Sequence, residues 1–348
     1  MRIVSYSTAE STDRLGVVVG DTAGPDDRTG LQVVDVDIPG PDGTPLNSTA
    51  AYVGGFPESA VAVAAWHAKS KAKGIPIADI ELGSPVRPTS FLDCSAAPRH
   101  LQQASITLFA RSAPRPLRPI VRPIVNIASK RVLGRALDDN VLYAKGRTSS
   151  FVGDGALVPW PDYTSFLDIE PELAIVMGAV PLGADAETVA TAVIGYAVLN
   201  DVSARDVQLA EMVGGGLAAS KDMDNGNVLG PWLVTPDELA DPLGQDVTVT
   251  TDRGRRWVGT TADYSMSPVE LVTALARKQS IAAGTVIGMG TVADTCGLER
   301  DEWLEPGESV AISFSGIGTL NQTLGPAPKL DTRRWGGRPR LVLGGVLR

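Results

Sequence analysis

The fold of this chain is decided by two stretches, DIEPELAIVMGAV at residues 168–180 and IGYAVLNDVSARDVQ at residues 194–208. Each contains an apolar run of strand length. Glu170 and Glu172 begin the first run, and the period of two in a strand places their side chains on one face. Pro171 between them cannot donate a hydrogen bond to a neighbouring strand, so this strand should begin there or lie at a sheet edge.

Carboxylates at the ends of these runs indicate a divalent metal ion. Asp201 ends the second run, as Glu170 and Glu172 begin the first. Hard cations such as Mg2+, Mn2+ and Ca2+ prefer carboxylate oxygens, so a site that also included Asp93 would be chemically coherent. The spacing between Asp93 and His100 carries little information by itself. The chain lacks the Cys and His spacing of structural zinc.

Composition limits the class of protein. The 348 residues suffice for two domains, or for one large domain with a small attachment. Plentiful glycine (37) and proline (25) favour many short strands and turns. The net charge of −9 argues against binding to a nucleic-acid backbone. Cys94 and Cys296 are too few for a disulfide framework or a thiolate metal site.

The first residues, MRIVSYSTAESTDRLG, contain neither the apolar core nor the small-residue cleavage site of a secretory signal. No uninterrupted apolar run approaches the roughly 20 residues that a membrane-spanning helix requires. We therefore expect a cytoplasmic protein without a membrane partner.

Three segments predict the domain organisation. Residues 1–85 alternate short β-branched runs with turns and should form a small β-rich domain, with a helix at about residues 57–73. A larger domain should cover about residues 86–325. Residues 326–348 are basic and rich in Pro and Gly, and they should form an extension.

A basic stretch at about residues 111–135 contains no acidic residue. Four prolines in its first half argue against one continuous helix. We expect a solvated loop or an oligomer contact. Attraction of an anionic substrate and a mobile lid are the alternatives.

Several elements of the larger domain have clear local signals. Residues 247–251 and 256–260 predict a hairpin. A capping box predicts a helix after Ser267. Residues 284–292 predict a strand, residues 310–320 a strand pair, and the glycines at 214–216 a flexible loop that delivers Lys221.

The chain resembles the fumarylacetoacetate hydrolase superfamily in five motifs in the same order, namely DIEPELAIVMG, IGYAVLNDVSARDVQ, LGPWLVTPDEL, VIGMGT and LEPGESVAISFSGIGTL. The resemblance covers about residues 86–325 and is most specific at NDVSARD. It implies a mainly β, α+β fold, in which a small N-terminal β-domain precedes a rolled mixed β-sandwich catalytic domain of the fumarylacetoacetate hydrolase type. It also implies a homodimer in which each chain binds one divalent cation. Mg2+ is the expected ion, and Mn2+ and Ca2+ are the alternatives.

The resemblance implies roles by motif position. The metal ligands would be Asp93, Glu170, Glu172 and Asp201. The catalytic residues would be His100 as general base, Lys221 at the developing oxyanion, and a glutamate paired with His100, either Glu299 or Glu302. The residues that bind or support the substrate would be Tyr143, Arg205, Gln208 and Thr291.

The implied reaction is hydrolysis of a carbon–carbon bond in a 1,3-diketo acid of the acylpyruvate or fumarylacetoacetate type. A metal ion would polarise the carbonyl under attack, and His100 would take a proton from water. The alternatives are a decarboxylase, hydratase or isomerase of 2-oxo acids with the same site, and a non-catalytic protein that keeps the fold. The expected partner is a small oxo or diketo acid.

Overall fold

The computed structural model describes residues 1–137, 141–214, 216–239, 241–326 and 335. A 12-stranded mixed sheet organises the chain, in the order β6–β3–β2–β1–β16–β14–β13–β19–β8–β9, with β10 beside β16 and β7 beside β1. The strands of its second half are β16 (Asn227–Val234), β14 (Val193–Asp201), β13 (Pro171–Met177), β19 (Thr285–Thr291), β8 (Ser90–Cys94), β9 (Tyr143–Lys145) and β10 (Phe151–Val152).

The two stretches that decide the fold form the middle of this sheet. All residues of β13 and β14 are buried, which explains why their apolar runs are continuous rather than alternating. The two strands pair antiparallel, with Pro171 opposite Asn200. Pro171 begins β13, as predicted, but β13 is not an edge strand, because β19 pairs along its other side.

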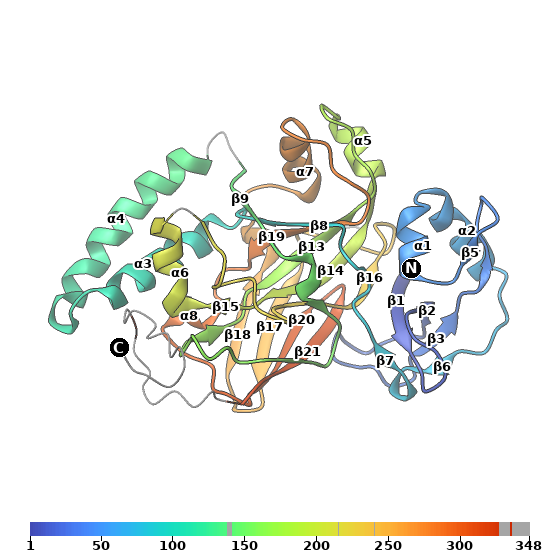
Figure 1. Ribbon diagram of the computed structural model, residues 1–348, viewed down its shortest axis with the longest axis horizontal. Coiled ribbons are helices and arrows are strands. Elements are labelled where there is room, and N and C mark those ends of the chain that lie inside the picture. The colour runs from blue at the N-terminus through green and yellow to red at the C-terminus, as the bar shows by residue number, and fades with distance from the viewer. Residues whose placement is uncertain (138–140, 215, 240, 327–334, 336–348) are drawn as a thin grey trace, which may run out of the picture.

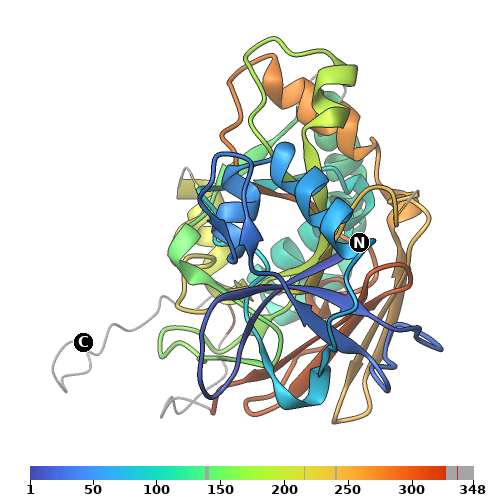
Figure 2. The ribbon, with the colours of Figure 1, turned by 90° about the vertical axis from the view of Figure 1, so that its right-hand side faces the viewer.

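Residues 1–85 extend the same sheet, because Ile3 of β1 pairs with Leu233 of β16. The strands of this sheet here are β1 (Arg2–Ser7), β2 (Arg14–Val19), β3 (Gln32–Asp35), β6 (Ile75–Pro76) and β7 (Glu81–Leu82). The short strands β4 (Ile38–Pro39) and β5 (Pro45–Leu46) pair with each other instead. The helices are α1 (Thr49–Gly54), α2 (Glu58–His67) and the 3₁₀ turn η1 (Ile77–Asp79), so the predicted helix at 57–73 is shorter than expected. These elements face the viewer, in blue, in Figure 2.

Side chains from a loop after β2 fasten the N-terminal residues to the second half of the chain. Arg28 Nη1 lies 2.7 Å from Asp154 Oδ2. Asp26 accepts hydrogen bonds from the hydroxyls of Ser313, at 2.5 Å, and Thr319. Polar contacts therefore join the two predicted domains in addition to the shared sheet.

A five-stranded sheet forms a second layer, which lies below the central sheet in Figure 1. Its strands, in order, are β11 (Ala156–Val158), β21 (Gly318–Leu324), β20 (Ser309–Phe314), β17 (Asp246–Thr251) and β18 (Arg256–Thr260). The predicted hairpin is β17 with β18, and the predicted strand pair is β20 with β21. The predicted mainly β, α+β class is confirmed by these layers and their separate helices.

The remaining elements lie outside these two sheets. The strands are β12 (Leu167–Asp168) and β15 (Ser203–Ala204), which pair with each other. The helices are α3 (Pro98–Ser112), α4 (Arg118–Leu137), α5 (Ala186–Thr191), α6 (Arg205–Gly214), α7 (Pro268–Ala276) and α8 (Gly297–Arg300), with the 3₁₀ turns η2 (Arg115–Leu117), η3 (Thr148–Ser150) and η4 (Thr261–Asp263). The predicted capping box is present at Ser267 and Glu270.

The predicted loop at residues 111–135 is wrong, because α3, η2 and α4 occupy it. Two of its four prolines fall in the break between α3 and α4, as the proline argument required. Pro123, however, lies inside α4, where it removes one backbone hydrogen bond. The helix persists because it packs along α3, with Gln102 Nε2 donating to Asn126 Oδ1 at 2.5 Å.

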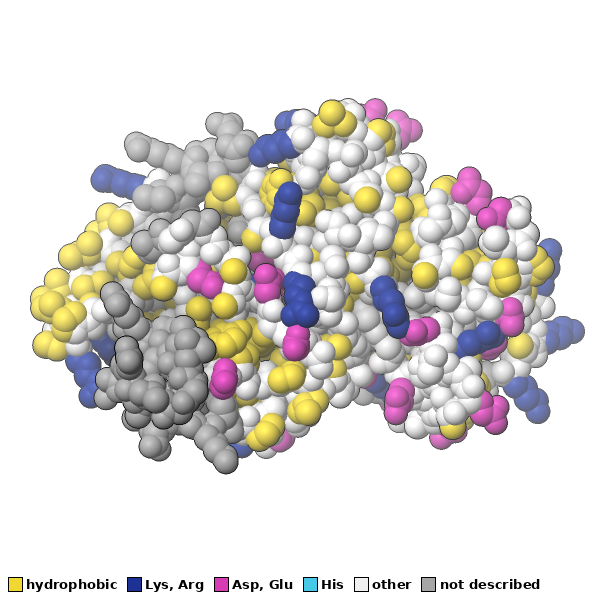
Figure 3. Space-filling view, in the orientation of Figure 1, with side chains coloured by type: hydrophobic (Ala, Val, Ile, Leu, Met, Phe, Trp, Pro, Cys, Tyr) yellow, Lys and Arg dark blue, Asp and Glu magenta, His cyan; other side chains and the backbone are white. Residues whose placement is uncertain are grey.

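An apolar row remains exposed on α4. Ile120, Ile124 and Ile127 recur at helical spacing and are 58%, 60% and 62% exposed. Figure 3 shows hydrophobic side chains gathered over this left-hand end, with Lys and Arg beside them. Within the described ranges, no helix has the length and apolarity to cross a membrane.

Trp335 is the one described residue beyond position 326. Its ring lies 5.2 Å from that of Trp303, and the Arg111 guanidinium lies over both rings. The rest of the predicted extension lies outside the described residues.

Candidate active site

The carboxylates predicted from the sequence meet because the ends of four neighbouring strands, which carry the site residues, lie on the same side of the central sheet. β13 begins where its antiparallel neighbours β14 and β19 end, and β8 runs parallel to β19. Glu172 therefore lies near Asp201 at the end of β14, Thr291 at the end of β19 and Asp93 near the end of β8. The backbone N–H of Asp201 donates to the carbonyl of Glu170 at 3.1 Å, which sets these two residues opposite each other.

Asp93, Glu172 and Asp201 form a compact group. One oxygen from each lies within 4.8 Å of the others. The backbone N–H of Gly290 donates to Glu172 Oε2 at 3.1 Å, whereas Glu172 Oε1 is buried and has no hydrogen-bond partner among the described residues. A Cβ at Gly288 would overlap Glu172 Oε2. The glycines of the VIGMGT motif thus leave room for this carboxylate and donate to it.

Two buried cations engage the neighbouring carboxylates. Lys221 Nζ lies 2.5 Å from Asp201 Oδ2 and also contacts Glu170. Arg205 donates to Asp168 Oδ2 at 2.9 Å through Nε, and to Glu170 through Nη1. Glu170 is therefore the carboxylate that both cations engage.

The pKa values of the carboxylates differ according to their contacts with these two cations. Burial raises the pKa of Asp93 to about 8, against the opposing charge of Lys221. Burial and the neighbouring charge of Asp93 raise the pKa of Glu172 well above its usual value. Burial also acts on Glu170, but the charges of Arg205 and Lys221 outweigh it and hold the pKa of that carboxyl below its usual range. Burial and repulsion between the carboxylates therefore outweigh the neighbouring cations at Asp93 and Glu172, but not at Glu170.

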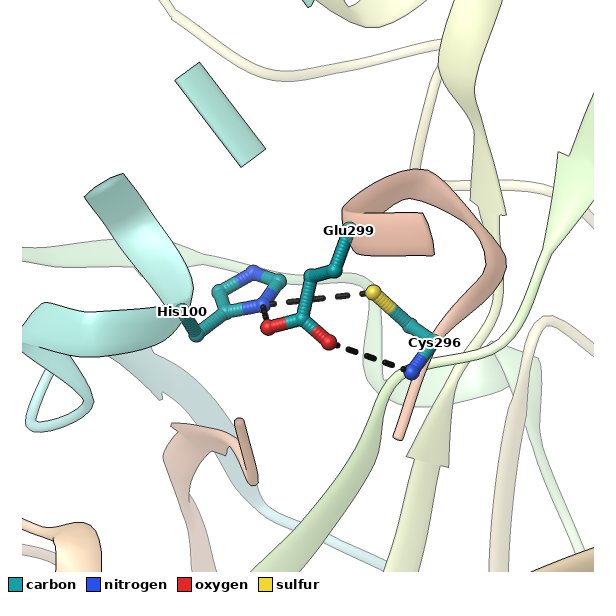
Figure 4. Close-up of side chains that lie close together, drawn as sticks. All are labelled: His100, Cys296 and Glu299. Atoms are coloured by element: carbon teal, nitrogen blue, oxygen red, sulfur yellow. Dashed lines mark hydrogen bonds and ion pairs between the residues drawn. The ribbon is translucent and has the colours of Figure 1, made fainter. Parts of the chain in front are cut away.

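His100 links this group to a glutamate from α8. His100 lies in the first turn of α3, and its Nδ1 is 2.9 Å from Glu299 Oε1 (Figure 4). Glu299 Oε2 accepts the backbone N–H of Cys296 at 3.3 Å, and Cys296 Sγ lies 4.0 Å from the same Nδ1. The other ring nitrogen, Nε2, is 3.9 Å from Glu170 Oε1. The imidazole therefore stands between a buried glutamate and the carboxylate group.

The sequence left Glu299 and Glu302 as alternative partners of His100, and in the structure Glu299 is the one that contacts it. Glu302 Oε2 instead accepts a hydrogen bond from Trp257 Nε1 at 2.9 Å. Asp301 between the two glutamates ends α8 in the left-handed conformation, with φ of 58°. The two side chains consequently reach different parts of the molecule.

Two buried residues that sequence reasoning did not single out support the site. Asp168 accepts the first two backbone N–H groups of α8, each at 2.9 Å, in addition to Arg205 Nε. Asp168 stands two residues before Glu170, as Glu170 does before Glu172, and this spacing in the sequence could have marked it. Asn227 Nδ2 donates to Asp201 Oδ1 at 2.9 Å, and no local pattern marked this residue.

A cavity of about 130 Å3 opens beside the carboxylates and His100. Gln208 and Thr291 line it, whereas Arg205 lies behind it and donates to Gln208 Oε1 at 3.0 Å. Tyr143 is not among the described residues that line it, and its hydroxyl lies 3.4 Å from Gln279 Nε2. The cavity lining therefore includes most of the predicted site residues, and those outside it are Tyr143, Asp201, Arg205 and Glu299.

The donor set fits a divalent cation. Asp93, Glu172 and Asp201 offer hard oxygen atoms at close range, and Glu172 Oε1 is an orphaned acceptor in the described structure. Two cations, Lys221 and Arg205, face the wider group of five carboxylates that also includes Asp168 and Glu170.

The family model for the C-terminal part of fumarylacetoacetate (FAA) hydrolase matches residues 126–325, more than half of the chain. The chain belongs to this family. The matched FAA hydrolase region carries Glu170, Glu172, Asp201 and Lys221, and it begins after Asp93 and His100.

An uncharacterized protein of Staphylococcus aureus (strain USA300) is 30% identical over 174 residues, or 49% of this chain. The match spans 57% of that relative, little more than half its length.

Solved structures of lower identity share the FAA hydrolase fold. The 2-hydroxyhepta-2,4-diene-1,7-dioate isomerase from Mycobacterium marinum has a TM-score of 0.65 at 19% identity, over 94% of this chain and 100% of that one. Maleylpyruvate hydrolase from Sphingobium sp. SYK-6 has a TM-score of 0.63 at 19% identity, with the same coverage. The predicted fold type is thereby confirmed, and proteins of this fold include named isomerases and hydrolases.

Proposed function

We propose that this member of the FAA hydrolase family is a metal-dependent hydrolase that cleaves a carbon–carbon bond in a 1,3-diketo acid. The observation that carries the proposal is the 2.9 Å pair of His100 and Glu299 beside the carboxylate group. A general base next to a cation site is the arrangement that water activation requires. Acylpyruvate-like or fumarylacetoacetate-like acids are the proposed substrates.

The proposed ligands are Asp93, Glu172 and Asp201, with Glu170 as the fourth. Bound there, a divalent cation would act as a Lewis acid on the substrate carbonyls. Carboxylate oxygens suit Mg2+, and Mn2+ or Ca2+ are the alternatives.

His100 would move the protons of the reaction. With the Nδ1–H group donating a hydrogen bond to Glu299, Nε2 would be free to take a proton from water as the water oxygen bonds to the acyl carbonyl carbon. The bond from that carbon to the neighbouring CH2 then breaks, and the electron pair leaves with the CH2 carbon. Protonation of this carbon by the imidazolium completes a 2-oxo acid, and the acyl part leaves as a carboxylic acid.

Lys221 would stabilise the negative charge that develops. Although burial opposes it, the charges of Asp201 and Glu170 raise the pKa of Lys221, so the ammonium stays charged. Gln208 and Thr291 would bind substrate oxygens from the cavity wall.

An isomerase, decarboxylase or hydratase of a 2-oxo acid is the alternative function. The solved M. marinum neighbour is named as an isomerase, and a base beside a cation site can also move a proton between carbon atoms. These reactions do not yield two acids, so product analysis separates them from hydrolysis.

The deciding experiment incubates the protein and Mg2+ with an acylpyruvate, oxaloacetate or a 2-hydroxydienoate, and identifies the products by NMR. Hydrolysis predicts a carboxylic acid and pyruvate in equal amounts from the acylpyruvate. Carbon dioxide and pyruvate from oxaloacetate, a water adduct of the 2-hydroxydienoate, or an isomer of it would favour the alternative. Absence of turnover over a broad panel would support a non-catalytic protein and overturn both.

The two histidines offer a matched pair of variants. His100→Ala should lower kcat by about 100-fold or more, since general-base catalysis contributes roughly 10²–10⁴-fold. Mg2+ affinity measured by calorimetry should persist, because His100 is not a proposed ligand. His67→Ala, on α2, is the control and should leave kcat unchanged. Wild-type turnover by the His100 variant would contradict the proposed base.

We also propose that the chain works as a cytoplasmic homodimer. This assembly is expected from the family resemblance, and the free cysteines Cys94 and Cys296 are typical of a reducing compartment such as the cytoplasm. Sedimentation velocity of the purified chain tests the dimer, and cell fractionation tests the compartment.

A further inference from the structure

The cavity lining has two chemically different parts. One part carries the carboxylates with His100 and Lys221. The other is apolar and consists of side chains from the start of α3 and from the end of α6 onward, namely Ala97, Leu101, Met212 and Leu217. The first part suits the reacting oxygens of the substrate, so the apolar part is left for its acyl group.

Positive charge within the cavity is confined to one side chain. Among the described lining residues Lys221 is the only cation, and Asp201 and Glu170 already engage it. Arg99, next to His100 in the sequence, is turned to Asp263, with Nη1 2.8 Å from Oδ2. The apolar part therefore offers no described partner for an anionic group.

Lys145 from β9 is not among the described residues that line the main cavity. It borders a separate cavity of about 10 Å3, which Asp93 and Lys221 also line. A space of roughly 10–15 Å3 holds one water molecule. No acyl group fits there.

The size of the main cavity limits the acyl group as well. Its volume of about 130 Å3 is well below the roughly 300–1,000 Å3 typical of sites for drug-sized ligands. A substrate of a few carbon atoms is therefore the appropriate size.

We infer that the acyl group of the substrate is short, aliphatic and uncharged, so that the substrate carries a single carboxylate. This inference rests on the proposed function and narrows its substrate class. A second carboxylate beside Leu101 and Met212 would lie against apolar side chains and would find no cationic partner among the described lining residues, whereas an aliphatic group would pack against them. The solved isomerase neighbour is named for a dioate, which has two carboxylates, so this chain would differ from it.

Two five-carbon acids test the inference by binding alone. The acids 2-oxopentanoate and 2-oxoglutarate differ only at the far end, where the first has a methyl group and the second a carboxylate. In calorimetric titrations of the Mg2+-loaded protein, we expect 2-oxopentanoate to bind at least about tenfold more tightly.

A variant that supplies the missing cation sharpens the test. Met212→Arg places a guanidinium at the apolar part, and the fold should tolerate it because Met212 is 51% exposed. The preference for 2-oxopentanoate should shrink by about tenfold or reverse. Leu157→Arg on β11 is the matched control, since Leu157 is 55% exposed and lies outside the cavity lining.

Each outcome separates this inference from the proposed hydrolysis. Equal or tighter binding of 2-oxoglutarate by the wild-type protein would overturn the inference and leave hydrolysis standing, and so would an unchanged preference in Met212→Arg. The expected preference without turnover of any acylpyruvate would support the inference and overturn hydrolysis. Failure of both acids to bind would overturn the assignment of this cavity.

Discussion

At position 288 a glycine leaves the space that the Glu172 carboxylate fills. Gly288→Ala should displace that carboxylate and weaken Mg2+ binding by at least about tenfold, as measured by calorimetry. Gly24→Ala is the control, because a Cβ there meets no atom within 4 Å. Unchanged Mg2+ affinity in Gly288→Ala would show that Glu172 is not a ligand.

Glu299 is proposed to orient His100 and to stabilise its protonated form. Glu299→Gln preserves the shape of the side chain but removes its charge, so kcat should fall by about 100-fold while KM and Mg2+ affinity stay close to wild type. Glu302→Gln keeps an acceptor for Trp257 and should leave kcat unchanged. Steady-state kinetics of the two variants measures kcat and KM. An equal loss of kcat in both variants would argue against a special role for Glu299.

The sequence predicted the site residues that are marked by their place at strand ends. Glu172 and Asp201 were marked in this way, whereas Asp93 was predicted from the family resemblance. The three residues meet because β14, β13, β19 and β8 are consecutive strands of the central sheet. The choice between Glu299 and Glu302 could not be made from the sequence, because the left-handed residue between them decides the direction of each side chain.

At the scale of elements, α4 is a helix that tolerates an internal proline. Pro123→Ala should strengthen it, since proline in a helix interior costs about 3 kcal/mol relative to alanine. Native-state hydrogen exchange of the α4 amides should slow. Pro119→Ala in the first turn is the control, because proline is well tolerated there. Faster exchange in Pro123→Ala would show that the proline is required for packing on α3.

The basic stretch was predicted as a loop because its prolines were counted without regard to position. Two lie between helices and one in a first turn, where they do little harm. Packing against α3 then outweighs the cost of Pro123. The hairpin of β17 and β18 and the capping box of α7 were predictable because their signals are local.

At the scale of the whole molecule, Asp26 ties the N-terminal residues to the second sheet. Hydrogen bonds from Ser313 and Thr319 hold the pKa of Asp26 below its usual value. Such a carboxylate stabilises the fold above its unfolded pKa of about 3.9, and this contribution is lost as pH falls through the lower folded pKa.

Asp26→Asn should therefore lower the free energy of unfolding at pH 7, and the difference from wild type should shrink below about pH 4. Urea denaturation at several pH values measures this. Asp21→Asn, exposed in the same loop, is the control. A difference that does not depend on pH would assign the loss to shape rather than to charge.

The sequence predicted a small β-rich N-terminal domain, because strand patterns are local, but it did not predict which strand this domain would pair with. The pairing of Ile3 with Leu233 joins segments that are distant in the chain, and no pattern within either strand specifies that partner. The residues before β8 consequently extend the sheet whose other half carries the carboxylates.

The carboxylate group comes mainly from the buried central sheet, whereas His100 and Glu299 come from the helices α3 and α8. This division has an evolutionary consequence. We expect mutations in these two helices to change the proposed proton-transfer groups, while the sheet keeps the proposed ligands of the ion. A laboratory search for new activities in this chain should therefore diversify α3 and α8 and leave β8, β13, β14 and β19 untouched.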